Sequence, residues 1–154
     1  MNMQEGIIID NSKQQPELTA SAPELSKMLQ IIEDKILPKT RKYVREGNKV
    51  FGAALLDKDW NYILAETNDE LNNPLFHEEV KLINEWSKTT NAGDRGRAAQ
   101  EAIFLSTHEP CCMCIRYVRV ILRNRKGFLY VNQASDFNVK KKTNVSCFGL
   151  KIAL

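Results

Sequence analysis

The chain has 154 residues, of which 43% are hydrophobic and 27% are charged, with a formal net charge of +3 and four cysteines. This length fits one domain, the composition is that of a soluble globular protein, and no apolar run approaches about 20 residues, the length of a membrane span. The mild charge argues against a strongly basic nucleic-acid-binding protein, and the clustering of three cysteines argues against a disulfide framework and for a reducing, cytoplasmic compartment.

The first part of the chain is polar and lacks the basic segment of a secretory signal. We expect residues 1–20 to form a disordered arm and residues 21–154 to form a single domain. Ser21 and Glu24 have the spacing of a capping box, which predicts a helix start. The apolar residues that follow at helical spacing are Leu25, Met28, Leu29, Ile32 and Ile36.

Pro38 is expected to end or kink this helix, because a proline inside a helix lacks the N–H for the backbone bond. A further helical segment over 40–46 would close at Gly47. The apolar run 50–56 and the segment 62–65 predict two strands of a hairpin, joined by a turn at 57–59.

The second half of the chain alternates helices and strands. Residues 68–74 are a loop by composition, and the glycine-containing segment 91–97 is expected to be a flexible connection. We expect helices over 77–86 and 113–122, strands over 102–105 and 127–131, and either a fifth strand or a short helix over 147–154. This order predicts an α/β domain with a mixed sheet covered by helices.

The stretch EPCCMC at 109–114 holds three of the four cysteines. Cys111 and Cys114 are three positions apart, so both sulfurs can face one ion from the first turn of a helix. The helix N-terminus is expected to lower the pKa of both thiols and so favour thiolates. Two thiolates with one imidazole give three zinc ligands, and a fourth position open to water is typical of a catalytic site.

A second fragment, NPLFHEE at 73–79, opens the preceding helix. In the middle of a helix the side chains of His77 and Glu79 would point away from each other. At the first turn, however, both side chains can reach a common point beyond the helix end. His77 could then bind the metal, while Glu79 takes up and delivers protons beside it.

Together, His77-x-Glu79 and Pro110-Cys111-x-x-Cys114 resemble the zinc-dependent deaminases of nucleobases, the cytidine deaminase-like superfamily, and in particular its guanine, cytosine and tRNA adenosine deaminase branch. The resemblance runs from Phe51 to the strand at Phe128. It implies a three-layer α/β/α fold with a mixed central sheet of four to five strands.

The resemblance also implies roles for individual residues. His77, Cys111 and Cys114 would be the ligands of Zn²⁺, and Glu79 would be the catalytic proton shuttle. The expected substrate contacts, each of which also has a structural interpretation in a loop or in the core, are Asn68, Phe51, Glu78 and Glu109. The implied reaction converts an amino group on a small nucleobase, nucleoside or nucleotide, of the cytosine or guanine type, to a carbonyl with release of ammonia, in an enzyme that is expected to be a homodimer.

Several alternatives stay open at this point. The chain could be a tRNA adenosine deaminase, for which Lys140-Lys141-Lys142 is the only compact basic cluster, or a non-catalytic zinc-binding subunit whose pocket is blocked by Glu78 and Arg116. It could also be a thiol redox module that uses Cys111 and Cys114. Cys112 is expected to face the interior or solvent, and a four-ligand knot of His108 with the three clustered cysteines is a minor alternative.

Overall fold

A computed structural model describes residues 20–122, 128–132 and 149–153, the last two segments by their backbone alone. The strands are β1 (Gly52–Leu56), β2 (Tyr62–Thr67), β3 (Ile103–Ser106), β4 (Phe128–Asn132) and β5 (Gly149–Ala153). They form one sheet in the order β2-β1-β3-β4-β5. β1 is antiparallel to β2 and β3, whereas β4 is parallel to β3 and β5 is parallel to β4.

This mixed sheet confirms the α/β prediction, and the last segment, which was open between strand and helix, is a strand. Side chains are described for β1, β2 and β3. Residues 1–19 of the predicted arm and Lys140-Lys141-Lys142 lie outside the described residues, so the predictions made for them stay predictions.

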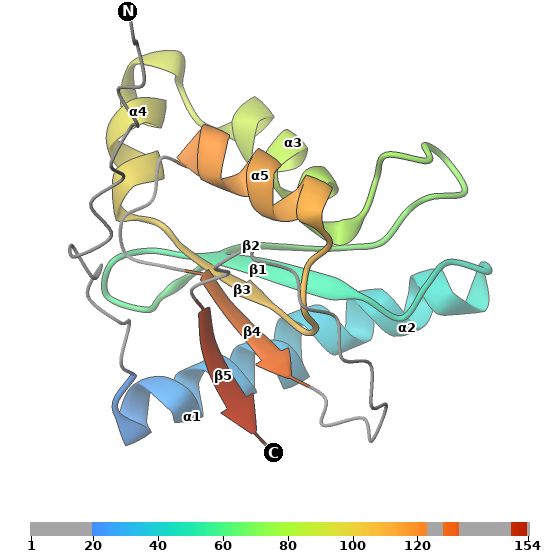
Figure 1. The fold of residues 1–154 in the computed structure, drawn as a ribbon, viewed down its shortest axis with the longest axis horizontal. Helices are drawn as coiled ribbons and strands as arrows, with labels where there is room; N and C mark the ends of the chain where they lie inside the picture. Colours follow the sequence, from blue (N-terminus) through green and yellow to red (C-terminus); the bar gives the residue numbers. More distant parts are fainter. Residues whose placement is uncertain (1–19, 123–127, 133–148, 154) are drawn as a thin grey trace, which may run out of the picture.

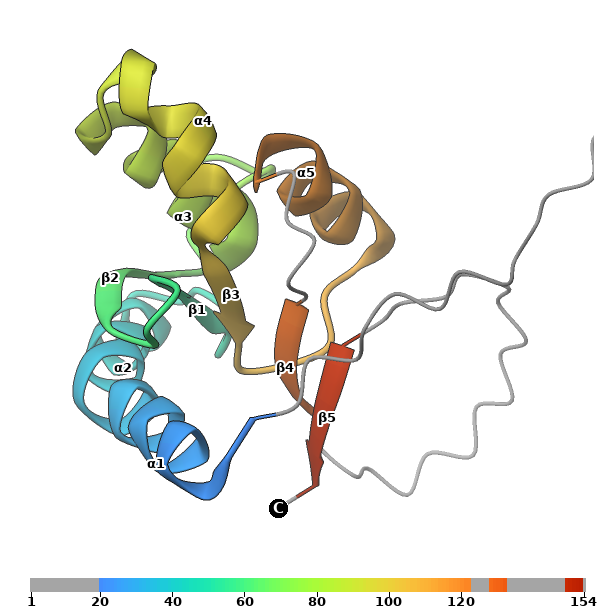
Figure 2. The ribbon, with the colours of Figure 1, turned by 90° about the vertical axis from the view of Figure 1, so that its left-hand side faces the viewer.

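Helices cover both faces of the sheet (Figures 1 and 2). One layer consists of α1 (Ala22–Ile31), the π-helical segment η1 (Ile32–Ile36) and α2 (Leu37–Arg45), and the other consists of α3 (Glu78–Thr89), α4 (Ala92–Glu101) and α5 (Cys112–Leu122). The predicted three-layer α/β/α arrangement is therefore present. Within the described residues, no helix is both long enough and apolar enough to cross a membrane.

Two apolar cores lie on the two faces of the sheet, because successive side chains of a strand point to opposite faces. In β1, Ala53 and Leu55 join the core that includes Leu82 and Trp86 of α3. Ala54 and Leu56 join the other core, with residues of α1 and η1. All five residues of β1 are buried, as the continuous apolar run predicts.

The first helical layer begins as predicted. The backbone N–H of Ser21 donates to the Glu24 carboxylate at 2.6 Å, and the Ser21 hydroxyl donates to the same oxygen at 2.8 Å. Pro38, however, does not end the helix. The preceding turn widens to a π-helix, in which the N–H of Leu37 donates to Ile32 O, and Pro38 falls in the first turn of α2. A proline is tolerated at that position because it replaces an N–H that needs no helical partner.

The prediction of a flexible connection at 91–97 is wrong, since this segment belongs to α4. Gly93 and Gly96 each weaken a helix by about 1 kcal/mol relative to alanine, so local propensity alone favours a connection over a helix in this segment. Tertiary contacts outweigh that cost: Ala99 is buried in the core, and the guanidinium of Arg95 donates to the carbonyls of Ser87 and Thr90 at 2.7 and 3.0 Å.

Candidate metal centre

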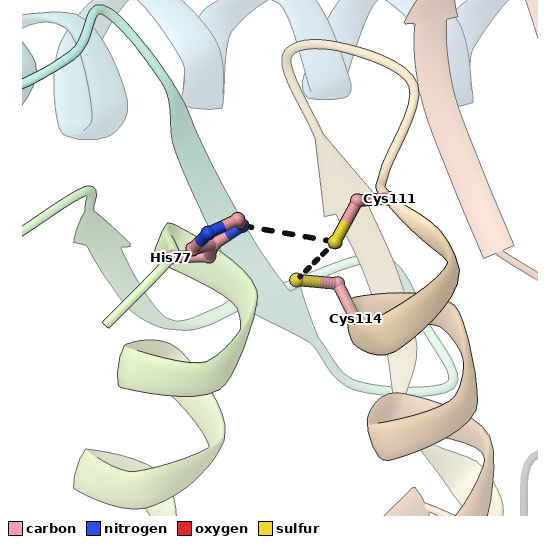
Figure 3. Close-up of side chains that lie close together, drawn as sticks. All are labelled: His77, Cys111 and Cys114. Carbon is pink, nitrogen blue, oxygen red and sulfur yellow. Dashed lines mark hydrogen bonds between the residues drawn. The ribbon is translucent and has the colours of Figure 1, made fainter. Parts of the chain in front are cut away.

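Three side chains from two helix starts meet at one edge of the second helical layer (Figure 3). His77 is the N-cap residue of α3, Cys111 directly precedes α5, and Cys114 lies in the first turn of α5. Cys111 Sγ lies 3.7 Å from His77 Nδ1 and 3.4 Å from Cys114 Sγ. The three ligand atoms lie within 4.8 Å of one another, so the structure brings these predicted residues together.

These separations can be compared with an ideal zinc site. With Zn–S bonds of about 2.3 Å and a Zn–N bond of about 2.0 Å at tetrahedral angles, two sulfurs lie about 3.8 Å apart and a sulfur and a nitrogen about 3.5 Å apart. The observed 3.4 and 3.7 Å differ from these values by only a few tenths of an ångström. The donor set and its spacing therefore fit a zinc ion.

The other members of the cysteine cluster lie as the spacing predicts. Cys112 is exposed and is not part of the group formed by His77, Cys111 and Cys114. The alternative of a four-ligand knot is wrong, because among the described residues His108 groups with Glu78 and Glu79, whereas Cys111 and Cys114 group with His77.

The electrostatics of Cys114 differ from the sequence expectation. Its thiol is buried, and burial together with the charge of Glu79 raises its pKa well above the usual range. In the metal-free protein, the helix N-terminus does not compensate for the effect of burial on the pKa of Cys114. A bound cation favours thiolate far more strongly than a helix end does, so the ionisation of this ligand depends on the metal.

Glu79 lies beside this cluster and is completely buried. Neither of its carboxylate oxygens has a hydrogen-bond partner among the described residues. Burial and the neighbouring charge of Glu78 raise the pKa of Glu79 to about 7, whereas the Cys114 thiol and the charge of His108 act in the opposite direction. A carboxyl group whose pKa lies near neutrality can both accept and release a proton at physiological pH.

His108, which the sequence analysis considered only as a ligand in the cysteine knot, contacts Glu78 instead. Its Nδ1 atom lies 2.9 Å from the carboxylate of Glu78, which is itself 1% exposed. Burial disfavours the charged imidazole, but the Glu78 carboxylate outweighs burial and raises the pKa of His108. The imidazole also stacks on Phe51, with 3.9 Å between ring centroids. One face of Phe51 is thus covered by a protein side chain.

The remaining predicted contact residues lie around this group. Asn68 is 1% exposed, its N–H donates to Phe51 O, and its side-chain amide donates to the Glu70 carboxylate at 2.9 Å. The Lys49 ammonium, followed by Asn68 and the charge of His77, keeps the pKa of Glu70 below its usual value. Glu109 is exposed. No local sequence pattern points to Glu70, because its contacts depend on how the loop folds.

Comparison with known proteins agrees with this geometry. The family described as the cytidine and deoxycytidylate deaminase zinc-binding region matches residues 27–126. No curated protein matched the sequence.

Among solved structures, the fold is similar to one from a study of A-to-I editing by tRNA:A34 deaminases at the wobble position of transfer RNA, with 20% identity and a TM-score of 0.54 over 83% of this chain and 98% of that chain. It is also similar to the guanine deaminase from Nitrosomonas europaea, with 19% identity and a TM-score of 0.50 over 77% of this chain and 62% of that chain. At these identities the likeness shows the fold. The family match, together with the His/Cys/Cys cluster, supports Zn²⁺ as the cofactor. The chain therefore belongs to the cytidine deaminase-like superfamily, through its cytidine and deoxycytidylate deaminase zinc-binding region.

Proposed function

We propose that the chain is a zinc-dependent hydrolytic deaminase that converts an amino group on a small nucleobase, nucleoside or nucleotide, of the cytosine or guanine type, to a carbonyl with release of ammonia. The observation that carries this proposal is the juxtaposition of a three-residue metal cluster with the buried carboxyl group of Glu79, whose pKa is about 7.

In this proposal His77, Cys111 and Cys114 hold the zinc. Three protein ligands leave one tetrahedral position for water, as in catalytic zinc sites. When bound, zinc lowers the pKa of a water and so provides a nucleophile at neutral pH. Glu79 would accept a proton at a carboxylate oxygen, deliver it to a ring nitrogen of the substrate, and supply a second proton to the departing amino group, which leaves as ammonia.

The substrate side of the proposal uses the residues next to the cluster. Asn68 would hydrogen-bond the base or ribose, the backbone at Glu78 and the carbonyl of Glu109 would contact the ring carbonyl and the leaving amino group, and Phe51 would contribute to the wall of the site. The Glu78 carboxylate lies 2.9 Å from His108 Nδ1, and this contact supports a Glu78 side chain that is engaged within the protein rather than one that blocks the site. A homodimer and a cytoplasmic location stay predictions.

A second candidate, a tRNA adenosine deaminase, is favoured by one observation. The solved structure from the tRNA:A34 deaminase study is matched over 98% of its length, which leaves little of it without a counterpart in this chain. A flipped-out adenosine in an RNA loop would then occupy the same site as the small substrate. The two candidates differ in substrate and not in chemistry, so one experiment can separate them.

The experiment measures ammonia release by the zinc-loaded protein. The panel consists of cytosine, guanine and adenine as bases, nucleosides and nucleotides, with a tRNA that carries adenosine in its anticodon. We expect Glu79→Gln to retain one zinc per chain and to lose turnover by at least about 10²-fold, because general acid–base catalysis contributes about 10²–10⁴.

Glu85→Gln, at a partly exposed position of the same helix, is the control and should turn over as the unchanged protein does. Turnover that survives in Glu79→Gln would contradict the proposal. Ammonia release from tRNA alone would select the second candidate, and a protein without stoichiometric zinc would indicate a thiol redox module.

A further inference from the structure

Glu70 contacts the imidazole of His77 on the side opposite to the cysteines. His77 Nδ1 lies 3.7 Å from Cys111 Sγ, whereas His77 Nε2 lies 3.4 Å from Glu70 Oε1. An imidazole that binds a metal through one nitrogen carries its proton on the other, and a carboxylate at that N–H fixes both the tautomer and the ring orientation.

We propose that Glu70 is a positioning residue that keeps the proton of His77 on Nε2 and so directs Nδ1 toward the metal. This inference rests on the proposed ligand role of His77. It adds a residue that neither the motif spacing nor the family match assigns.

The Glu70 carboxylate is itself held by two other side chains. Lys49 Nζ lies 2.9 Å from Oε1 and 2.8 Å from Oε2, and the Asn68 amide donates to Oε2 at 2.9 Å. One carboxylate thus joins the proposed zinc ligand His77 to the proposed substrate contact Asn68. A change at Glu70 should therefore disturb the metal and the substrate side of the site together.

The loop that carries Glu70 has a fixed shape, so these contacts are not those of a free side chain. The backbone N–H of Asp69 donates to Phe76 O at 2.8 Å, which closes the loop just before His77. The Asp69 carboxylate accepts from Lys81 Nζ at 2.7 Å, and Lys81 is 6% exposed on α3. The residue before Glu70 is thereby tied both to the residue before His77 and to the helix that His77 opens.

The contact predicts a measurable effect on metal affinity. Loss of the group that accepts from the second ring nitrogen of a metal-binding histidine typically weakens metal binding about 10–100-fold. The reason is that metal binding must then restrict the rotation of the imidazole, which costs entropy. Glutamine keeps an acceptor at the same place but not the charge. Glu70→Gln should therefore lie between the unchanged protein and Glu70→Ala.

The test is a zinc competition titration of the full chain against a chromogenic chelator, with Zn²⁺ alone as the probe. We expect Glu70→Ala to weaken zinc binding by about 10–100-fold and Glu70→Gln to weaken it by a smaller but measurable factor, below about 10-fold. In the Co²⁺-loaded protein, the visible bands of Glu70→Ala should shift, because the ligand field changes with the orientation of the imidazole. Glu101→Ala, which removes an exposed carboxylate at the end of α4, should bind zinc as the unchanged protein does.

The reference variant His77→Ala separates this inference from the proposed function. If His77→Ala loses tight zinc binding while Glu70→Ala keeps it, the role of Glu70 is overturned and the ligand set stands. If His77→Ala keeps tight binding, the ligand set itself fails. If Glu70→Ala lowers the unfolding temperature of the metal-free protein, Glu70→Gln becomes the deciding variant. Unchanged zinc affinity and unchanged Co²⁺ bands in Glu70→Gln would then overturn the positioning role of Glu70.

Discussion

The imidazole of His108 and the carboxylate of Glu78 form an ion pair 2.9 Å long immediately beside Glu79. Glu78 is almost fully buried, and its second oxygen has no hydrogen-bond partner among the described residues. The pair joins the first turn of α3 to the loop between β3 and α5. The two segments that carry the proposed zinc ligands are therefore held together by a contact that does not involve a metal.

Removal of either His108 or Glu78 should leave the charge of the other residue buried without a partner. We expect His108→Leu to lower the free energy of unfolding of the metal-free protein by about 1–3 kcal/mol, the cost of an unsatisfied buried polar group. Urea unfolding of His108→Leu, Glu78→Gln and the double variant measures the coupling. If the two single effects simply add in the double variant, the residues do not interact in solution.

Zinc content should separate the three clustered cysteines. We expect Cys111→Ser and Cys114→Ser each to lose tightly bound zinc, because a serine hydroxyl does not replace a thiolate ligand. Cys112→Ser is the matched control, since Cys112 is exposed and lies outside the cluster. Metal analysis after dialysis gives the stoichiometry, and loss of zinc in Cys112→Ser would show that the ligand assignment is wrong.

The raised pKa of Glu79 predicts a pH dependence of stability. The folded protein binds this proton more tightly than the unfolded chain, with a pKa of about 7 against an ordinary value of 4.5. The resulting stabilisation is complete below pH 4.5 and is lost as the pH rises through about 7. One pKa unit corresponds to about 1.4 kcal/mol, so the loss is at most on the order of 3 kcal/mol.

Glu79→Gln should remove this contribution, because the amide does not titrate. Urea unfolding of the metal-free proteins at intervals from pH 5 to about pH 8 measures the difference between the two curves. We expect Glu79→Gln to gain stability relative to the unchanged protein as the pH rises. Parallel curves would mean that Glu79 has an ordinary pKa.

Lys81 and Lys88 provide a comparison of a buried and an exposed ion pair on the same helix. Lys81 lies 2.7 Å from Asp69, with both side chains less than one tenth exposed, whereas the Lys88 side chain is 61% exposed beside Glu85. We expect Lys81→Met to lower the free energy of unfolding by about 3–5 kcal/mol and Lys88→Met by less than about 1 kcal/mol. Equal effects in thermal unfolding would contradict the importance of the buried pair.

Two glycines should respond in opposite directions to alanine. A Cβ atom at Gly52 would lie 2.7 Å from Thr40 Oγ1 and closer still to Ile36, so Gly52→Ala should destabilise the protein by about 1–3 kcal/mol. A Cβ atom at Gly93 in α4 would meet nothing within 4 Å, so Gly93→Ala should stabilise it by about 0.5–1 kcal/mol. Thermal unfolding measures both, and a destabilised Gly93→Ala would argue against the helical assignment of α4.

The features that the sequence predicted well are those encoded over a few neighbouring positions. The capping box of Ser21 and Glu24, the apolar run of β1 and the spacing of Cys111 and Cys114 are local, and each is present in the structure. The meeting of His77 with the cysteines followed from the motif pairing, since both fragments open helices. The roles of Asn68, Phe51, Glu78 and Glu109 toward a substrate stay predictions.

The features that the sequence did not predict depend on residues distant in the chain. The contact of His108 with Glu78 joins the loop before α5 to the start of α3. The contact of Glu70 with His77 depends on a loop whose shape is stabilised by the ion pair of Asp69 with Lys81. The sequence did not predict α4 because its two glycines lower the local helix propensity. The burial of Ala99 in the core, which depends on tertiary packing, stabilises the helix nevertheless. In each case the deciding energy comes from packing or ion pairing that a local pattern does not contain.

The arrangement of the ligands has a consequence for the integrity of the fold. His77 and Cys111 are 34 positions apart, and the chain between them forms α3, α4 and β3. A cation that binds both residues closes this stretch into a ring, as a covalent cross-link would, and so reduces the entropy that the unfolded chain could gain. A bound ion would thereby hold α4 and the central strand β3 between two fixed points, and its release would free about a fifth of the chain from that restraint.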